Sequence, residues 1–461
     1  MQTNFTPEQL RDPDTAESEK VLRACVHCGF CTATCPTYVL LGDELDSPRG
    51  RIYLIKQMLE EDRPATPEVV KHVDRCLSCL ACMTTCPSGV HYMHLVDHAR
   101  KHIEATYERP RADRALRDLL AFVLPYPARF RAALLGATVG KPFGRFLPGR
   151  LGAMMKLAPK GGPSAPSWVD RPQTVPAQGP RKGRVTVLLG CAQRVLAPAI
   201  NEATVRLLTR HGFEVAIGKG EGCCGALTHH MGKEPSALAF ARANIDAWWR
   251  LKEAGGLDAV VINTSGCGTT VKDYGFMLRT DPAYAEKAAW ASGITKDVTE
   301  LMAARGLMPA VADTDFTVAY HAACSLQHGQ KVTAAPKTLL ARAGFAVKEV
   351  PEGHLCCGSA GTYNRLQPEI AGRLQRRKVE NIERTEPDMV AAGNIGCITQ
   401  IGEIAAMPVL HTAELLDYAT GGPVPPDLEK ARARRRARQG RLGPEPAKDG
   451  LGIPVEVDTS A

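Results

Sequence analysis

Eight of the sixteen cysteines fall into two runs near the N-terminus that share one spacing. The runs are Cys25, Cys28, Cys31 and Cys35, followed by Pro36, and Cys76, Cys79, Cys82 and Cys86, followed by Pro87. Three thiolates at i, i+3 and i+6 of a tight loop can reach three irons of one cube. Zinc sites more often use paired Cys-x₂-Cys units, and disulfides are rare in reducing compartments. The spacing therefore predicts two [4Fe–4S] clusters and a role in electron transfer.

The fourth cysteine of each run follows a turn and precedes proline, so it is expected to point away from its own cluster. Where two such runs occur together, that cysteine binds the cluster of the other run. One cluster is predicted to take Cys25, Cys28, Cys31 and Cys86, and the other to take Cys76, Cys79, Cys82 and Cys35. Arg49 and Arg51 lie between the runs and either donate hydrogen bonds toward a cluster or are ordinary surface arginines.

The other eight cysteines form a duplicated set. They are Cys191, Cys223, Cys224 and Cys267, repeated as Cys324, Cys356, Cys357 and Cys397. All eight are candidate metal ligands, because packing alone does not explain a cysteine set repeated at a fixed spacing. The ligand is left open among further Fe–S clusters, one or two zinc ions, and no permanent metal. Gly225 and Gly358 are expected to allow positive φ beside the sulfurs.

Five histidines near these cysteines are either ligands, proton relays or ordinary structural residues, the last being the usual case for a lone histidine. They are His229, His230, His321, His328 and His354.

The elements that position the first two runs are expected to be helical. Apolar residues recur at helical spacing from about Arg51 to Glu61, and Thr66-Pro67-Glu68 predicts a helix start that leads into Cys76. Each later repeat reads strand, helix, strand, Cys-Cys-Gly, which predicts an α/β unit with a mainly parallel sheet. The fold class is thus a multidomain α+β protein, with an N-terminal α-helical ferredoxin domain followed by two similar α/β cysteine-rich lobes.

Five regions are predicted. They are a two-cluster helical domain at 15–110, a helical segment and Pro/Gly-rich linker at 111–182, cysteine-rich repeats at 183–310 and 311–420, and a basic, disordered tail at 421–461. The apolar helix at the start of the linker region is expected to pack on the chain's own core rather than on a partner or a membrane.

The formal net charge is +8, and seven basic residues lie between Lys430 and Arg441, so the body is nearly neutral. No folded basic motif accompanies the tail, which makes nucleic acid an unlikely partner class. The N-terminus lacks a secretory pattern and no apolar run approaches a membrane span, so a cytoplasmic location is expected. No G-x-G-x-x-G follows a strand, so the chain itself is not expected to bind flavin.

The region between the runs resembles the helical ferredoxin module of flavin dehydrogenases. The Cys-Cys-Gly repeats resemble the cysteine-rich domain of heterodisulfide reductase-type subunits, whose pattern has five cysteines per repeat. Here each repeat has four, because Thr264 and Asn394 stand where that family has the additional cysteine. This departure argues against the alternative of a thiol–disulfide reductase. Another alternative is a zinc-stabilised scaffold in which only the N-terminal clusters conduct.

The strings around residues 222–232, 263–268, 356–364 and 393–397 resemble the iron–sulfur subunits of bacterial glycolate oxidase (glycolate dehydrogenase). The resemblance implies an electron-transfer subunit of an oxidoreductase complex. FAD-containing partner subunits would oxidise glycolate to glyoxylate, and this chain would pass the electrons to an acceptor such as quinone. Contact with the inner face of the cytoplasmic membrane would then be peripheral. The alternative is the same role in a lactate or glycerol-3-phosphate dehydrogenase complex.

Overall fold

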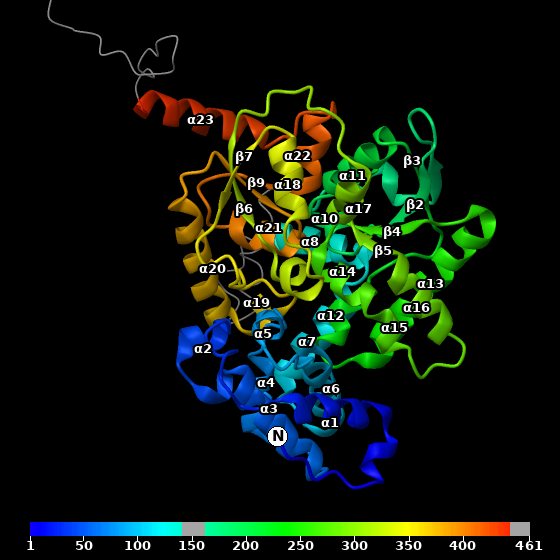
Figure 1. Cartoon of the computed structure of the whole chain (residues 1–461), viewed down its shortest axis with the longest axis vertical. Helices are drawn as coiled ribbons and strands as arrows, with labels where there is room; N and C mark the ends of the chain where they lie inside the picture. The colour runs from blue at the N-terminus through cyan, green and yellow to red at the C-terminus, as the bar shows by residue number, and fades with distance from the viewer. Residues whose placement is uncertain (141–161, 443–461) are drawn as a thin grey trace, which may run out of the picture.

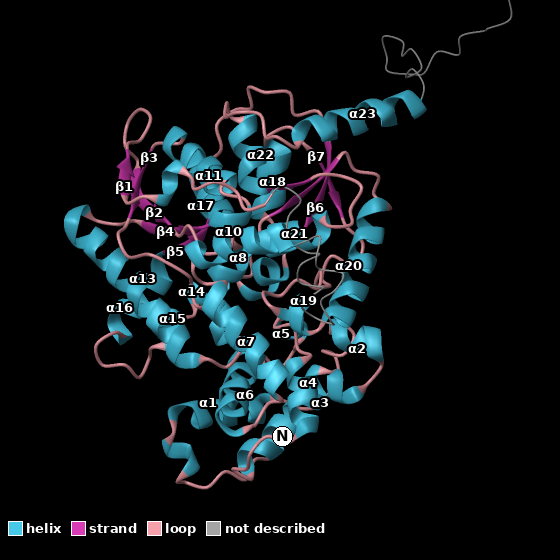
Figure 2. Ribbon diagram, turned by 180° about the vertical axis from the view of Figure 1, so that it is seen from behind, coloured by secondary structure: helices cyan, strands magenta, loops and turns pink. Residues whose placement is uncertain are grey.

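The chain folds into a helical N-terminal part and two α/β lobes, seen in a computed structural model that describes residues 1–140 and 162–442. Figure 1 shows the N-terminal helices in blue at the foot of the molecule, beneath both lobes. The strands gather at two separate places above these helices, one in each lobe, as Figure 2 shows. The predicted fold class, a mixed multidomain protein with a helical domain and two similar lobes, is confirmed.

The N-terminal part holds short helices separated by the two cysteine loops. They are η1 (Gln9–Arg11), α1 (Pro13–Ala24), α2 (Pro36–Leu41), η2 (Glu44–Asp46), α3 (Pro48–Glu60), α4 (Pro67–Asp74), α5 (Ala81–Thr85) and α6 (Tyr92–Thr106). Proline at the first turn and a capping side chain start several of them. Ser47 caps α3 and Thr66 caps α4 by accepting from the backbone N–H three residues on. Both helices predicted here are confirmed.

Two helices then cross from the N-terminal part toward the lobes: α7 (Arg111–Val123) and α8 (Pro127–Gly140). They meet at a bend of 119°, where Pro125 and Pro127 interrupt the helix. Their apolar side chains are largely exposed, with Phe122 at 59% and Val139 at 77%. The prediction that this segment packs on the chain's own core therefore holds only for a few residues such as Leu120. Within α7 only Arg117 and Leu120 are buried, and α8 has no buried residue, so too little of the described chain covers the apolar side chains of this segment.

Lobe 1 is built on a five-stranded sheet of order β1-β3-β2-β4-β5. Its strands are β1 (Gln173–Val175), β2 (Gly183–Val187), β3 (Phe213–Ile217), β4 (Ala259–Ile262) and β5 (Thr295–Asp297), all parallel except β1. Its helices are η4 (Trp168–Asp170), α10 (Gln193–Leu196), α11 (Ala199–Arg210), α12 (Ala226–His229), α13 (Glu234–Gly255), α14 (Ser265–Lys272), α15 (Tyr274–Met277), α16 (Ala285–Ile294) and α17 (Val298–Arg305).

Lobe 2 repeats the design with a parallel four-stranded sheet of order β7-β6-β8-β9. Its strands are β6 (Thr317–His321), β7 (Ala346–Glu349), β8 (Met389–Ala392) and β9 (Val409–His411). Its helical elements are the π-helical turn η5 (Ser325–Gly329), α18 (Ala335–Arg342), α19 (Tyr363–Leu366), α20 (Pro368–Glu383), α21 (Ile395–Gly402) and α22 (Thr412–Ala419).

The two lobes pack through equivalent helices, which gives a pseudo-twofold arrangement. Helix α11 of lobe 1 packs on α22 at the end of lobe 2, and α17 at the end of lobe 1 packs on α18 of lobe 2. One hydrophobic core runs through both lobes, with members such as Val205 and Leu416 fully buried. The predicted parallel α/β repeats and their paired arrangement are confirmed.

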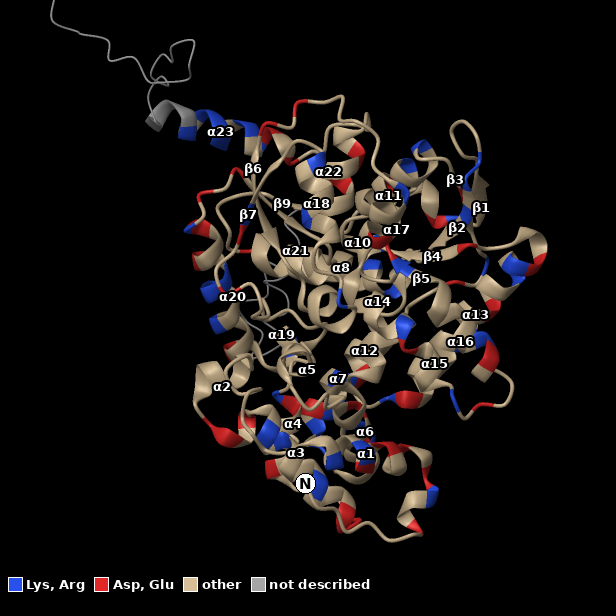
Figure 3. Ribbon diagram, viewed as in Figure 1, with Lys and Arg blue, Asp and Glu red and all other residues tan. Residues whose placement is uncertain are grey.

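The predicted disordered tail differs from the structure over its first part. Residues 428–442 form helix α23 (Leu428–Leu442), and Figure 3 shows that several residues of this helix are Lys or Arg. Leu428 and Ala431 are fully buried in the shared core, and Arg435 pairs with Asp313 at 3.0 Å. This segment is ordered as a helix because its apolar face packs into the core. The basic composition of the segment had predicted only a solvated run. Residues 443–461 lie outside the described part, and the predicted domain boundaries stay predictions.

Replacing Gly358 by alanine is expected to destabilise lobe 2 by at least ~2 kcal/mol. Gly358 has φ +90°, and an added Cβ would lie 2.5 Å from the Ala371 carbonyl oxygen. Backbone strain of this kind alone costs about 1–3 kcal/mol. Gly361→Ala is the matched control, because Gly361 has φ +65° but nothing within 4 Å of the added Cβ. Denaturant midpoints of the full chain provide the measurement, and equal losses in the two variants would contradict the steric argument.

Candidate iron–sulfur and metal centres

The first cysteine run forms an irregular loop between α1 and α2. Its first three cysteines line one cavity together with Cys86 and Cys82 of the second run. The loop turns through positive φ at His27 (56°) and Gly29 (84°). The structure therefore brings together the four predicted ligands Cys25, Cys28, Cys31 and Cys86.

The second run repeats the same backbone path. Ser78 (φ 50°) and Leu80 (φ 63°) stand at the same places after Cys76 as His27 and Gly29 do after Cys25. Positive φ is uncommon for residues other than glycine. Only Gly29 gave a sequence signal for this turn, so the matching conformation of the two loops was not predicted. Equal loops imply that both runs present their sulfurs in the same way.

Backbone and side-chain donors point at Cys76 of the second run and at Cys35 of the first. The Ser78 backbone N–H lies 3.4 Å from Cys76 Sγ, and the Tyr92 hydroxyl lies 3.8 Å from the same atom. Arg51 Nη1 lies 3.8 Å from Cys35 Sγ. Donors aimed at cluster sulfurs stabilise the negative charge of a cluster and raise its reduction potential.

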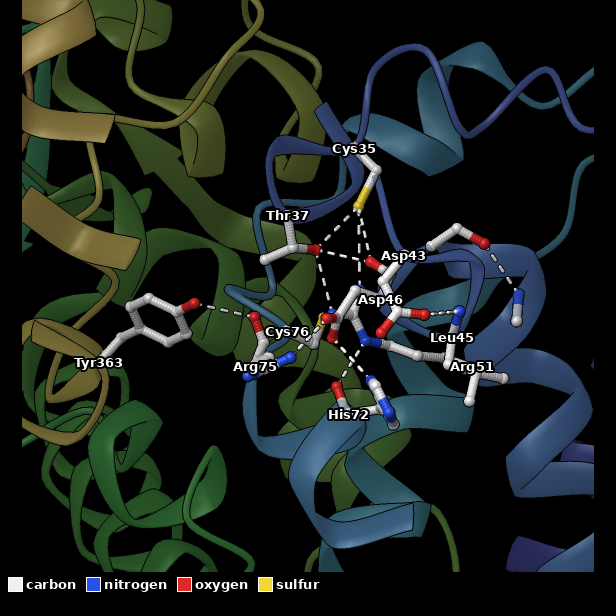
Figure 4. A network of polar contacts seen from close by, with 12 residues as sticks. Cys35, Thr37, Asp43, Leu45, Asp46, Arg51, His72, Arg75, Cys76 and Tyr363 are labelled. Atoms are coloured by element: carbon white, nitrogen blue, oxygen red, sulfur yellow. Dashed lines mark hydrogen bonds and ion pairs between the residues drawn. The ribbon is translucent and has the colours of Figure 1, made fainter. Parts of the chain in front are cut away.

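Arg51 is fully buried and belongs to a charged network beneath Cys35, drawn in Figure 4. Asp46 accepts from Arg51 Nη2 at 3.3 Å, from Arg75 Nη1 at 2.7 Å and from the His72 ring at 2.9 Å. Thr37 receives a further hydrogen bond from Arg51 at 3.0 Å. Of the two arginines considered from the sequence, Arg51 is a buried donor, while Arg49 pairs with Glu44 at a partly exposed position. Asp46 and His72 were missed, since nothing in their sequence context marks them.

Burial makes three thiols of these runs harder to ionise in the absence of a metal. Burial raises the pKa of Cys31 to about 11, and burial raises the pKa of Cys79 and Cys82 well above the usual value. For Cys82, the neighbouring thiols that add to this shift include Cys79, Cys76 and Cys35. Eight converging cysteines surrounded by N–H donors are the donor set that two [4Fe–4S] clusters require. The residues present therefore fit the predicted clusters.

The duplicated cysteines lie beyond the carboxyl ends of the parallel strands. In lobe 1, Cys191, Cys223 and Cys267 follow β2, β3 and β4, and in lobe 2, Cys324, Cys356 and Cys397 follow β6, β7 and β8. Loops after parallel strands meet at one edge of the sheet, which brings each set together. Gly225 N–H lies 3.4 Å from Cys223 Sγ, and Gly358 N–H lies 3.4 Å from Cys356 Sγ.

The nearby histidines take different roles. His229 and His230 each lie 3.3 Å from Asp97 on α6, and His328 lies 2.8 Å from the Thr84 hydroxyl. These three connect the lobes to the N-terminal part. His321 alone among the five lies against cysteine sulfurs in the part of the chain that the structure describes, next to Cys357 and Cys397.

The N-terminal part contacts both lobes, but its second run packs on lobe 2. Cys79 and Cys356 belong to one buried apolar cluster together with Tyr363. The Tyr363 hydroxyl donates to the Arg75 carbonyl at 2.9 Å, one residue before Cys76. The cysteine sets of the second run and of lobe 2 therefore adjoin each other. Tyr363 carried no signal in the sequence that linked it to this contact.

The contact between the N-terminal part and lobe 1 is expected to weaken as the pH rises. Burial alone would lower the pKa of His229, but the Asp97 carboxylate raises it above the usual 6.5, aided by Asp273 and Glu234. A raised pKa in the folded state stabilises the contact below the unfolded pKa, and this contribution is lost as pH rises through the folded pKa. Asp97, whose pKa is lowered despite burial by His229 and His230, loses its contribution only in strong acid.

His229→Gln is therefore expected to lower the unfolding temperature by a few degrees at pH 6 and by much less at pH 9. Thermal unfolding at both pH values measures the difference. His230→Gln serves as the control, because its more exposed ring is expected to contribute less. A deficit in His229→Gln that is the same at both pH values would contradict the assignment.

No single helix within residues 1–140 and 162–442 has the length and apolar character needed to cross a membrane. The bent pair α7 and α8 meets that length and composition only when the two helices are counted together.

Comparisons with known proteins agree with this architecture. Residues 21–90 match the 4Fe-4S dicluster domain, and residues 185–272 and 318–402 each match the cysteine-rich domain named CCG. A hypothetical protein from Helicobacter pylori shares the fold at TM-score 0.51 and 9% identity, covering 91% of this chain and 74% of that one.

Among curated proteins, the glycolate oxidase iron-sulfur subunit of Escherichia coli (strain K12) is 44% identical over 91% of this chain and 99% of its own length. The probable glycolate oxidase iron-sulfur subunit of Bacillus subtilis (strain 168) is 32% identical over 87% of this chain and 95% of its own length. Lactate utilization protein A of the same organism is 26% identical over 51% of this chain. The chain therefore belongs to the family of glycolate oxidase iron–sulfur subunits.

Proposed function

We propose that this chain is the electron-transfer subunit of a glycolate oxidase complex. FAD-containing partner subunits oxidise glycolate to glyoxylate, and this chain carries the electrons onward to an acceptor such as quinone. The 44% identity with the Escherichia coli subunit, which extends over nearly the whole of both chains, supports this assignment. The observation that carries the electron-transfer role is the pair of matching cysteine loops, one of which adjoins the cysteines of lobe 2.

The ligand assignment is part of the proposal. Cluster 1 is held by Cys25, Cys28, Cys31 and Cys86, and cluster 2 by Cys76, Cys79, Cys82 and Cys35. The cavity shared by the first set supports the former assignment. The position of Cys35 near the thiols of the second run supports the latter. When bound, the clusters supply one-electron redox chemistry.

The hydrogen-bond donors around cluster 2 would stabilise the negative charge on its sulfurs. Arg51 brings a buried positive charge to Cys35, while Asp46 orients that guanidinium by accepting one of its N–H groups. The Ser78 N–H and the Tyr92 hydroxyl act on Cys76 in the same sense. Each of these contacts favours the more negative, reduced state of the cluster.

Peripheral contact with the cytoplasmic face of the membrane follows from the choice of quinone as acceptor. Helices α7 and α8 are the surface proposed for it, because Leu119, Phe122, Leu135 and Val139 are all more than two-fifths exposed. Exposed apolar patches of this kind mark contact with a partner or a membrane. Flotation of the full chain with vesicles that contain quinone tests this surface directly.

Co-purification of the tagged chain from its own cells, followed by mass spectrometry and a substrate panel, tests the proposed function. Flavoprotein subunits and glycolate-dependent reduction of a quinone analogue are expected. A complex that ignores glycolate but oxidises lactate would assign the chain to the second candidate, which the lactate utilization relatives favour. The absence of any flavoprotein would overturn both.

A further inference from the structure

We propose that lobe 2 binds a single zinc ion, and that His321 is one of its ligands beside Cys357 and Cys397. The inference goes beyond the proposed function and does not depend on which substrate the complex oxidises. It separates the two lobes, whose cysteine sets look alike in the sequence, into sites of different chemistry. Three observations lead to it.

The first observation is the spacing of the donor atoms. One ring nitrogen of His321 and the sulfurs of Cys357 and Cys397 all lie within 4.8 Å of one another. Zn–S bonds are about 2.3 Å and Zn–N bonds about 2.0 Å, so ligands of one ion lie within ~4.6 Å of each other, close to the upper limit of the spacing found here. Thiolates of a cube bind different irons and stand farther apart. None of the eight cysteines of the N-terminal runs, all within the described residues, belongs to a set of three this close.

The second observation is the state of His321 itself. Its side chain is 1% exposed, and neither ring nitrogen has a hydrogen-bond partner among the described residues. Buried polar groups without partners are rare in folded proteins and need a specific explanation. Neutral imidazole is a common zinc ligand, and a metal bond would satisfy one of the two nitrogens.

The third observation is a buried lysine close to the same cysteines. Lys378 on α20 is 2% exposed, and its Nζ donates to the Glu352 carbonyl at 2.9 Å. The Glu352 carboxylate and the thiols of Cys356, Cys357 and Cys397 lie near its ammonium group. Buried charges require compensation, which metal-bound thiolates would add to that of the Glu352 carboxylate. A zinc ion with three thiolates and one imidazole carries one negative charge, which the ammonium of Lys378 offsets.

Cys324 and Cys356 are the candidates for the fourth ligand. Their sulfurs are 3.7 Å apart, and both belong to the same set as Cys357. The Asn394 side-chain amide donates to Cys397 Sγ at 3.4 Å, so this sulfur already has the hydrogen bond that often accompanies a metal thiolate.

Lobe 1 lacks each of these features. The residue 133 positions before His321 is Leu188, which is 2% exposed and packs in an apolar cluster with Cys224. A Cβ added to Gly225 would meet Ala237, and one added to Gly358 would meet Ala371, so these two alanines are equivalent. Lys378 lies seven residues after Ala371, as Asn244 lies seven residues after Ala237. Asn244 is uncharged, and its side chain donates to the Cys223 carbonyl. Lobe 1 therefore offers only cysteines, whereas lobe 2 offers cysteines, an imidazole and a cation.

Metal analysis of the anaerobically purified full chain tests the proposal. His321→Leu, which installs the residue that lobe 1 has, is expected to lose about one zinc per chain without loss of iron. The electron paramagnetic resonance signals of the N-terminal clusters are expected to stay unchanged. His321→Cys replaces the imidazole by a thiolate and is expected to keep the zinc. His354→Leu is the matched control, because it removes a histidine of the same lobe that lies outside the donor set, and it should also keep the zinc.

Retention of zinc in His321→Leu would overturn the proposal, as would loss of iron in place of zinc, or a wild-type chain with no zinc. Should His321→Leu fail to fold, X-ray absorption at the zinc edge of the wild-type chain gives an independent answer. Scattering from an imidazole ring supports the assignment, and scattering from sulfur alone contradicts it. Both readouts are separate from glycolate oxidation, so failure here is distinguishable from failure of the proposed function.

Discussion

Replacing Cys35 by serine is expected to remove the cluster of the second run, and replacing Cys86 is expected to remove that of the first. Each variant should fall from about eight to about four N-terminal irons per chain, because each cube holds four. Electron transfer from glycolate to the acceptor is expected to drop at least ~100-fold in both, since losing a direct ligand exceeds the 10–100-fold effect of losing its supporting residues. Iron content and electron paramagnetic resonance of the anaerobic protein provide the measurements.

Double variants decide whether the fourth cysteines are exchanged between the runs. With exchange, Cys35→Ser combined with Cys79→Ser damages one cluster and leaves about four N-terminal irons. Cys35→Ser combined with Cys28→Ser damages both clusters and leaves nearly none. Ligation within each run predicts the opposite result for the two combinations. Because both double variants contain the same Cys35 change, a general folding defect from that change would affect them equally.

The second large effect is expected from Asp46→Ala, which removes the acceptor beneath cluster 2. Asp46 is fully buried and binds two arginines and a histidine, so its loss leaves Arg51 as a buried charge without its carboxylate. Breaking a buried pair in this way costs about 3–5 kcal/mol. Denaturant-induced loss of the visible cluster absorption reports the stability of the N-terminal part. The expected loss of stability does not depend on any change in the reduction potential of cluster 2. That potential is measured separately.

Asp43→Ala is the matched control for this variant. Asp43 lies three residues away and caps η2 by accepting from the Leu45 N–H at 3.0 Å. Its carboxylate lies within 4.8 Å of Asp46 and His72, but in the described part of the chain its hydrogen bond goes to Leu45 rather than to Arg51. Loss of such a cap costs about 1 kcal/mol. Equal losses in the Asp43 and Asp46 variants would show that the buried network contributes no more than an ordinary cap.

The two cysteine runs of the N-terminal part have different neighbours. The second run adjoins lobe 2 through Cys79 and Cys356, while the cavity of the first run is lined by Arg49 and by the exposed Cys28. The contact with lobe 1 instead includes ion pairs between α6 and His229, His230 and Lys233, beside stacking of His94 on Phe276. Apolar packing at one lobe and charge pairing at the other means that pH and salt act mainly on the contact with lobe 1.

Local features of this fold were readable from the sequence because their causes are local. The caps at Ser47 and Thr66 fix the starts of α3 and α4 through hydrogen bonds that span only three residues. Helical apolar spacing predicted α3, and the repeated strand–helix pattern predicted both parallel sheets. The bend between α7 and α8 was visible as two prolines, but the exposure of Phe122 and Val139 depends on what the rest of the chain leaves uncovered.

The sequence by itself determined the two cysteine runs, the duplication of the later cysteines and the family to which the chain is similar. It could do so because ligand spacing and repetition are properties of the linear order. Only the tertiary structure decided that Asp46 and His72 hold Arg51 under Cys35, and that α23 packs its apolar face into the shared core. It also placed His321 against Cys357 and Cys397. The cysteine patterns of the two repeats are equal, so they gave no sign of this difference between the lobes. Burial and long-range pairing arise between segments that are distant in the chain, so no local pattern encodes them.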